Sequence, residues 1–106
     1  MLKVFHAYPT YGLPDEDIKH NIRKEQYTFM PLLTMEFDVS PAEIELADVN
    51  MRDTSMFGLG SQIVQMSKCD VVILGHDWEN DRACRLIKDV AESYGSRIID
   101  LDSKNI

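Results

Sequence analysis

Short apolar runs and longer stretches with helical spacing alternate along the chain. The clearest run, residues 71–74 (Val-Val-Ile-Leu), suits a strand buried on both faces of a parallel sheet. After Gly75, helical spacing predicts a helix over residues 80–94, capped by Asp77 or Asn80 and ended by Gly95 in the left-handed conformation. Its apolar stripe recurs at intervals of three and four residues and comprises Ala83, Leu86, Ile87, Val90, Ala91 and Tyr94.

The rest of the chain repeats this alternation of strand and helix. We expect further strands at residues 2–7, 33–37 and 97–101, and helices over residues 14–30, 41–47 and 55–67. Pro31 should end the first of these helices, and Ser40 with Glu43 forms a capping-box pattern at the start of the second. The expected inner faces are Ile18, Ile22 and Phe29 in the first helix, and Met56, Leu59, Ile63 and Met66 in the third.

Strand–helix alternation over residues 1–106 predicts one α/β domain with a parallel sheet and right-handed crossovers. The expected strand order is 2-1-3-4, as in flavodoxin-like folds with three layers. In such sheets ligands bind where strands give way to helices. This order brings loop 7–13 beside loop 75–81, which makes these two loops the expected walls of a ligand cleft.

Composition limits the classes of partner. The net charge of −7 disfavours binding to the phosphate backbone of nucleic acids or to anionic lipid. No apolar run approaches the roughly 20 residues that span a bilayer, and no signal-peptide pattern precedes the first strand. Cys69 and Cys84 are too few for a disulfide framework. We therefore expect a cytoplasmic protein with neither nucleic-acid nor membrane partners.

The two loops carry the residues that we expect to bind a ligand. Backbone amides at the start of helix 80–94 and the guanidinium of Arg82 favour an anion such as a phosphate. The expected cleft residues are Ala7, Tyr8, Pro9, Gly12, Gly75, His76, Trp78, Asp81 and Arg82.

Several of these side chains also have a purely structural interpretation. The three histidines lack metal-ligand spacing, so we expect no metal and no other cofactor, and His76 is more simply a solvated loop residue. Cys84 is better interpreted as a small packing residue than as a reactive thiol. Trp78 either stacks on a base or a partner, or covers the helix that follows it.

Motifs along nearly the whole chain, in this order and spacing, resemble the short bacterial and phage proteins related to nucleoside 2-deoxyribosyltransferases. The motifs are Lys3-Val4-Phe5 through Pro9 and Gly12, Asp15-Glu16-Asp17-Ile18, Phe57, Leu59-Gly60, Met66-Ser67-Lys68-Cys69-Asp70, Trp78-Glu79-Asn80-x-Arg82-x-Cys84, Ala91 and Tyr94-Gly95. The resemblance implies a flavodoxin-like fold with a nucleoside or nucleotide in the cleft. In active relatives a helix carries Asp-Ser-Gly-x-x-x-Glu or a similar run, whose Glu attacks the anomeric carbon of deoxyribose.

The position of that nucleophile is occupied by Ile87 in this chain, while Asp81 matches the aspartate of the family's run. An alkyl side chain cannot attack carbon, so the resemblance implies the fold and the cleft without the family's covalent mechanism. Asp81 is the candidate for any catalysis that remains. Because Ile87 completes the apolar stripe, we expect it to pack against the sheet.

Three functions stay open at this stage. The first is a binding protein that keeps the family's cleft for a nucleoside or nucleotide, or acts on another protein. The second is a deoxyribosyltransferase or deoxynucleotide N-glycosidase that uses a relocated carboxylate: Asp77, Glu79 or Asp81. The third is a phage inhibitor that presents the acidic segment 36–53 to a basic site on a host protein.

Helix 55–67 carries more apolar residues than one face of a small sheet needs, which predicts a homodimer.

Overall fold

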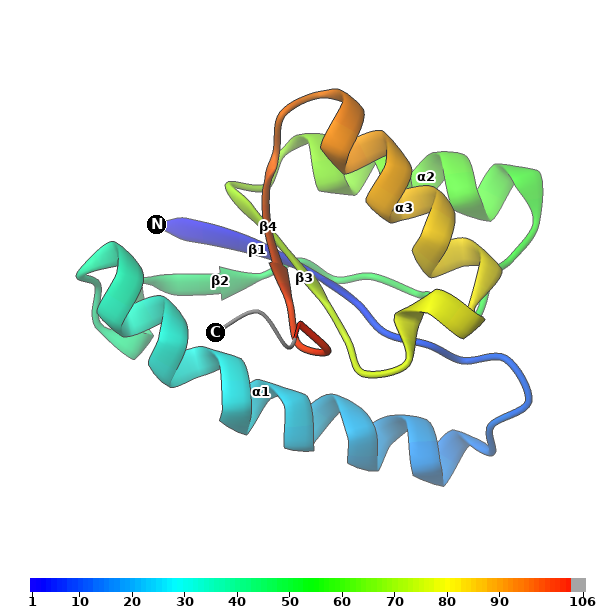
Figure 1. Cartoon of the computed structure of the whole chain (residues 1–106), viewed down its shortest axis with the longest axis horizontal. Coiled ribbons are helices and arrows are strands. Elements are labelled where there is room, and N and C mark those ends of the chain that lie inside the picture. The colour runs from blue at the N-terminus through cyan, green and yellow to red at the C-terminus, as the bar shows by residue number, and fades with distance from the viewer. Residues whose placement is uncertain (104–106) are drawn as a thin grey trace.

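A four-stranded parallel sheet forms the centre of the computed structural model, which describes residues 1–103. The strands are β1 (Leu2–Ala7), β2 (Ile44–Leu46), β3 (Val71–Leu74) and β4 (Arg97–Asp100). Their order is β2-β1-β3-β4, and every neighbouring pair is parallel. The predicted fold class and strand order are therefore confirmed, and the fold is flavodoxin-like with helices flanking the sheet (Figure 1).

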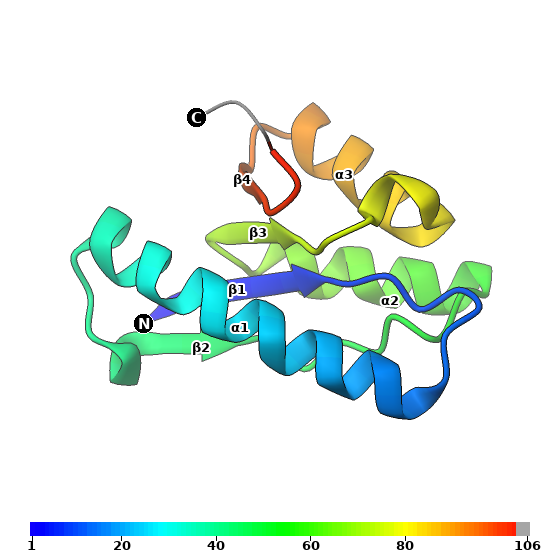
Figure 2. The same ribbon diagram turned by 60° about the horizontal axis from the view of Figure 1, so that its bottom comes forward.

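The helices divide between the two faces of the sheet. Helix α1 (Asp15–Phe37) covers one face, and α2 (Met56–Ser67) with α3 (Arg82–Ser93) covers the other, as Figures 1 and 2 show from two directions. The core beneath α1 is a cluster of five buried side chains: Val4, Phe29, Leu33, Val71 and Ile73. The larger core on the opposite face includes Phe5, Val72, Leu74, Cys84, Ile87 and Ala91. All four residues of β3 are buried, as the apolar run predicts.

Helix α1 continues through Pro31, so the predicted strand at residues 33–37 is wrong. Proline inside a helix removes one backbone hydrogen bond and is usually unfavourable by about 3 kcal/mol. Here Phe29 and Leu33 lie one turn apart on the same face, and both are fully buried against the sheet. Burial of two large side chains stabilises the helix by at least as much as the proline destabilises it, since each contributes roughly 1.5–3 kcal/mol.

The second strand lies instead where we expected the helix at residues 41–47. The capping-box contact is present, with the Ser40 amide donating to Glu43 Oε1 at 2.9 Å. It starts only a single 3-10 turn, η1 (Pro41–Glu43). Residues 44–46 then pair with residues 2–4 of β1, so sheet pairing with a distant segment overrides the local helix signal.

The helices on the second face begin close to their predicted positions. The Ser55 side chain caps α2 by accepting from the Gly58 amide at 3.0 Å. Asp81, rather than Asp77 or Asn80, caps α3, because the 3-10 turn η2 (Trp78–Asn80) comes first. Gly95 ends α3 with φ of +73°, as expected.

The residues predicted to be buried on these two helices are only partly confirmed. Ile87 is fully buried, as predicted, whereas Leu86 and Tyr94 are exposed and Cys84 takes a place in the core. In α2, Gln62 is buried while Met56 is 90% exposed. Within residues 1–103, no helix has the length and apolarity needed to cross a membrane.

Candidate functional site

Asp81 joins the two loops at the carboxyl edge of the sheet. Its Oδ2 accepts from the amides of Thr10 at 3.0 Å and Tyr11 at 3.3 Å, and its Oδ1 accepts from the amide of Cys84 at 3.0 Å. Burial disfavours the charged form, but the three backbone donors outweigh it and hold the pKa of Asp81 below its ordinary value. Asp81 is therefore a charged structural bridge whose oxygens are already occupied, which leaves it poorly suited to act as a base.

Two cavities open at this edge, where we expected one cleft. The α2–α3 cavity has a volume of about 460 Å³ and is lined by Tyr11, Thr54, Met56, Leu59, Asp81, Arg82, Ala83 and Leu86. The α1 cavity has a volume of about 300 Å³ and is lined by Pro9, Leu13, Asn21, Lys24, Glu25, His76 and Asp77. The loop between β1 and α1 contributes to both, through Tyr11 in the first and Pro9 in the second.

The α2–α3 cavity places the Arg82 guanidinium and the Asp81 carboxylate among apolar walls. It lies at the amino-terminal ends of both helices, because Met56 begins α2 and Arg82 begins α3. Helix amino termini and a guanidinium both favour an anion. The Tyr11 side chain is 87% exposed, and Leu59 and Leu86 contribute apolar surface. The cavity therefore suits a planar ligand that carries a negative group.

The α1 cavity is built around a buried carboxylate. Glu25 of α1 is 3% exposed; its Oε1 lies 2.7 Å from Nε2 of His6, and its Oε2 accepts from the His76 amide at 3.0 Å. Gly75 fits this arrangement because a Cβ there would lie 2.3 Å from Glu25 Oε1. The other ring nitrogen of His6, Nδ1, is buried and has no hydrogen-bond partner within residues 1–103.

Two carboxylates at the end of β4, Asp100 in the strand and Asp102 just after it, fix the loop between β3 and α3. Asp102 Oδ1 lies 2.8 Å from Nδ1 of His76, and its Oδ2 accepts from the Asp77 amide at 2.5 Å. The Trp78 indole donates to Asp100 Oδ1 at 2.9 Å and is 8% exposed. Trp78 therefore belongs to the core beneath α3 and is not available to stack on a ligand.

The structure distributes the expected cleft residues among several environments. Four of them are buried and line neither cavity: Ala7, Tyr8, Gly75 and Trp78. Pro9 and His76 line the α1 cavity, whereas Asp81 and Arg82 line the α2–α3 cavity. Gly12 is exposed, with φ of +74°, and lines neither.

Glu25 is the important residue that the sequence pattern did not reveal as part of a site. It falls on the inner face of α1, between the buried side chains of Ile18 and Phe29. A charged side chain on an apolar stripe is a usable signal, since acidic residues are almost never fully buried without a partner. Its partners, His6 and the His76 amide, lie 19 and 51 residues away and are brought close only by the fold.

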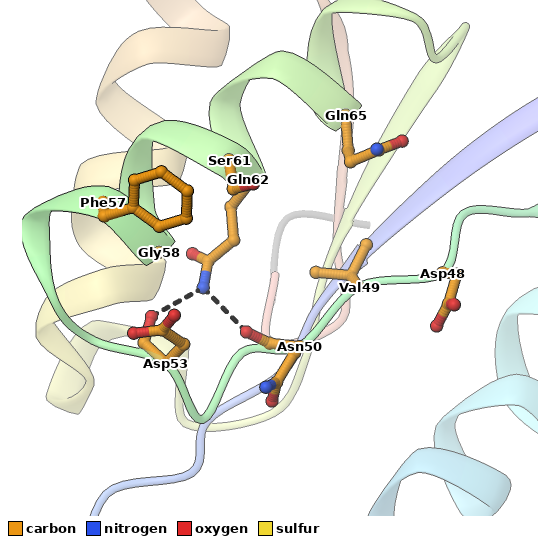
Figure 3. A pocket seen from close by; sticks show the side chains of 9 residues that line it. All are labelled: Asp48, Val49, Asn50, Asp53, Phe57, Gly58, Ser61, Gln62 and Gln65. Atoms are coloured by element: carbon orange, nitrogen blue, oxygen red, sulfur yellow. Dashed lines mark hydrogen bonds between the residues drawn. The ribbon is translucent and has the colours of Figure 1, made fainter.

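A third cavity lies beside α2, away from both loops. It has a volume of about 200 Å³, and Figure 3 shows its lining: Asp48, Val49, Asn50, Asp53, Phe57, Gly58, Ser61, Gln62 and Gln65. The amide nitrogen of Gln62 donates to the carbonyl oxygens of Asn50 at 2.9 Å and Asp53 at 3.0 Å. These bonds hold the segment before α2 against the helix.

Three of the six carboxylates in the acidic segment 36–53 already have partners within the protein. Glu36 pairs with Arg97, and hydrogen bonds from Ser40 lower the pKa of Glu43. Hydrogen bonds from Ser55 likewise lower the pKa of Asp53. The other three carboxylates of the segment belong to exposed residues: Asp38, Glu45 and Asp48.

Helix α3 offers no accessible nucleophile at position 87, the position that the sequence resemblance aligns with a catalytic glutamate. Ile87 is fully buried in the core with Val72 and Leu74, and Cys84 is fully buried in the same cluster, where burial raises the pKa of its thiol. Within residues 1–103, no three His, Cys, Asp or Glu side chains are placed to hold a metal ion. Comparisons with protein-family models, with curated proteins and with solved structures give no match.

Proposed function

We propose that this protein binds a nucleoside or nucleotide in the α2–α3 cavity and does not cleave N-glycosidic bonds by the mechanism of the nucleoside 2-deoxyribosyltransferases that it resembles. The observation that carries this proposal is the position of Arg82, at the first turn of α3 and on the wall of a cavity where α2 also begins. The two free cysteines fit a cytoplasmic location for such a protein.

The chemistry of the cavity supports a nucleotide more than a simple anion. A volume of about 460 Å³ lies within the range of small-molecule sites. The exposed ring of Tyr11 offers a stacking surface for a base, and Leu59 and Leu86 offer apolar contact. Arg82 and the amino-terminal end of α2 offer positive groups for a phosphate, whereas the amino-terminal end of α3 is already capped by Asp81.

Binding without glycosidic cleavage is supported by the burial of Ile87 and by the hydrogen bonds of Asp81, the two residues that match catalytic positions of the resembled family. The buried alkyl group of Ile87 cannot form the covalent intermediate. The carboxylate of Asp81 already accepts from three backbone amides, so activating a water would require breaking the bridge between the loops.

Titration with deoxynucleoside monophosphates, followed by NMR of the backbone amides, tests this proposal. We expect the signals of Tyr11, Arg82 and Leu86 to shift, and Arg82→Ala to weaken binding by at least about tenfold. Arg85→Ala is the matched control, because it removes the same charge from the same helix outside the cavity. Equal binding by both variants, or no shift in the wild-type protein, would contradict the proposal.

One observation favours a second candidate, an N-glycosidase that uses the α1 cavity. His76 lines that cavity together with Glu25 and Asp77. Its Nδ1 lies 2.8 Å from Asp102 Oδ1, which leaves Nε2 as the ring nitrogen available to a ligand. Release of free base from a deoxynucleotide, abolished by His76→Gln and retained in Arg82→Ala, would establish this candidate in place of the first.

A further inference from the structure

The outer face of α2 is uncharged and partly apolar. Residues 54–67 form the longest stretch of the chain without Asp, Glu, Lys or Arg, in a protein of net charge −7. Phe57 is 84% exposed and Val64 is 53% exposed on this helix. Exposed apolar side chains grouped on one uncharged face are typical of a contact surface.

We infer that this face is the contact between two copies of this chain, which pack through antiparallel α2 helices about a two-fold axis near Ser61. Two copies that each carry a charge of −7 repel one another over most of their surfaces. The α2 face is where they can approach with the least repulsion. The inference does not depend on ligand binding, because neither Phe57 nor Ser61 lines the α2–α3 cavity.

The charges that flank the uncharged stretch select the antiparallel arrangement. Asp53 precedes it and Lys68 follows it. Two helices related by an axis near Ser61 place Lys68 of each copy toward Asp53 of the other, which gives two attractive contacts by symmetry. A parallel arrangement would instead place each charge beside its like. Such a self-complementary pattern is what an isologous dimer requires.

The sizes of the side chains along the face fit the same register. Gly60 and Ser61 are small and exposed, and an added Cβ at Gly60 meets nothing within 4 Å, so two helix backbones can come close there. Counting outward from Ser61, Phe57 of one copy lies opposite Gln65 and next to Val64 of the other. Ser61 and Gln65 also line the cavity of Figure 3, which offers the ring of the second copy's Phe57 a recess.

Measuring the molar mass in solution as a function of protein concentration tests whether two copies associate through the outer face of α2. We expect the wild-type protein to be a dimer at high micromolar concentration, and Phe57→Glu to raise the dissociation constant by at least about thirtyfold, because a central aromatic residue is replaced by a charge. Tyr27→Glu is the matched control, since Tyr27 of α1 is also 84% exposed. A monomer at all concentrations, or dissociation by Tyr27→Glu and not by Phe57→Glu, overturns the inference.

Cross-linking tests the position of the axis. In a Cys69→Ser background, Ser61→Cys is expected to form a disulfide-linked dimer under mild oxidation, because a residue at a two-fold axis meets its own copy. Ser93→Cys, an exposed serine on α3, should stay monomeric in denaturing electrophoresis. Efficient linkage through Ser93→Cys with none through Ser61→Cys would place the contact elsewhere and refute the proposed arrangement.

Discussion

Glu25 and His6 form a buried pair at the centre of the fold, with Oε1 of the first 2.7 Å from Nε2 of the second. The side chains are 4% and 7% exposed, respectively. The same carboxylate accepts from the His76 amide at 3.0 Å, so one side chain of α1 connects β1 to the loop that follows β3. A buried polar group with two such partners is expensive to remove, because the partners remain buried after it is gone.

Glu25→Ala should lower the free energy of unfolding by about 3–5 kcal/mol, because it leaves His6 and the His76 amide without their acceptor. Glu25→Gln keeps an acceptor oxygen and the volume of the side chain, so its effect should be smaller, about 1–3 kcal/mol. Urea unfolding at neutral pH measures both. Glu16→Ala, an exposed position on the same helix, serves as the control and should change stability by less than about 1 kcal/mol.

Gly75→Ala should destabilise the fold by about 1–3 kcal/mol, because the new methyl group would lie 2.3 Å from Oε1 of Glu25, whose carboxylate is held by one partner on each oxygen. Gly60→Ala offers the contrast, since it adds a methyl group to a helix where nothing lies within 4 Å. It should raise stability by up to about 1 kcal/mol. Thermal unfolding in a Phe57→Glu background measures both without a contribution from association. Similar changes in both variants would argue against the close packing of Gly75 on Glu25.

The bridge formed by Asp81 should make stability depend on pH in a predictable direction. The pKa of Asp81 is lowered in the folded protein, so its stabilisation is present above the unfolded pKa of about 3.9 and is lost as the pH falls through the folded value. Asp81→Asn should therefore lower the free energy of unfolding by about 1–3 kcal/mol at neutral pH.

The difference between wild type and Asp81→Asn should shrink in acid, and urea unfolding over a series of pH values measures it. Other carboxylates with lowered pKa values, such as Glu43 and Asp53, titrate equally in both proteins and cancel in the difference. A difference that stays constant into acid would mean that the charge of Asp81 contributes nothing to the bridge.

Placing a glutamate at position 87, where the nucleoside 2-deoxyribosyltransferases that the chain resembles carry their nucleophile, should unfold the protein rather than create activity. Ile87 is fully buried, so Ile87→Ala should lower the free energy of unfolding by about 2–5 kcal/mol. Ile87→Glu should do so by more, because it buries a charge that has no partner. Leu86→Glu is the neighbouring control and should be tolerated, since Leu86 is 36% exposed. Circular dichroism reports folding, and a folded Ile87→Glu variant that releases base would reverse this conclusion.

The unit from β3 to α3 could be predicted because its signals are local. A fully apolar run and a regular helical stripe each reflect burial on the faces that the fold provides. The region from Pro31 to Leu46 was predicted wrongly because distant contacts decide it. Leu33 remains helical through packing on the sheet, and residues 44–46 become a strand by pairing with β1. The sequence pattern does not contain either contact.

The closeness of the two loops could be predicted from the sequence, whereas the division of the space around them into two cavities could not. Sheet order alone brings the two loops together, which is why Arg82 and Asp81 lie on one cavity. The loop between β3 and α3 is held by Glu25, Asp100 and Asp102, and the contacts of these carboxylates with His6, His76 and Trp78 join residues 19 to 51 positions apart in the chain. Trp78 is an example, because its indole donates to Asp100 and its ring is buried in the core instead of lining a cleft.

The two outer strands of the sheet bear on how this protein behaves at high concentration. Strand β2 has three residues and carries the exposed Glu45, and β4 has four residues and begins with the exposed Arg97. Short edges with charged side chains are poor templates for adding a strand from another molecule. Fibrils that grow by sheet extension from the native fold are therefore disfavoured, and prolonged storage of concentrated protein should produce no rise in thioflavin fluorescence.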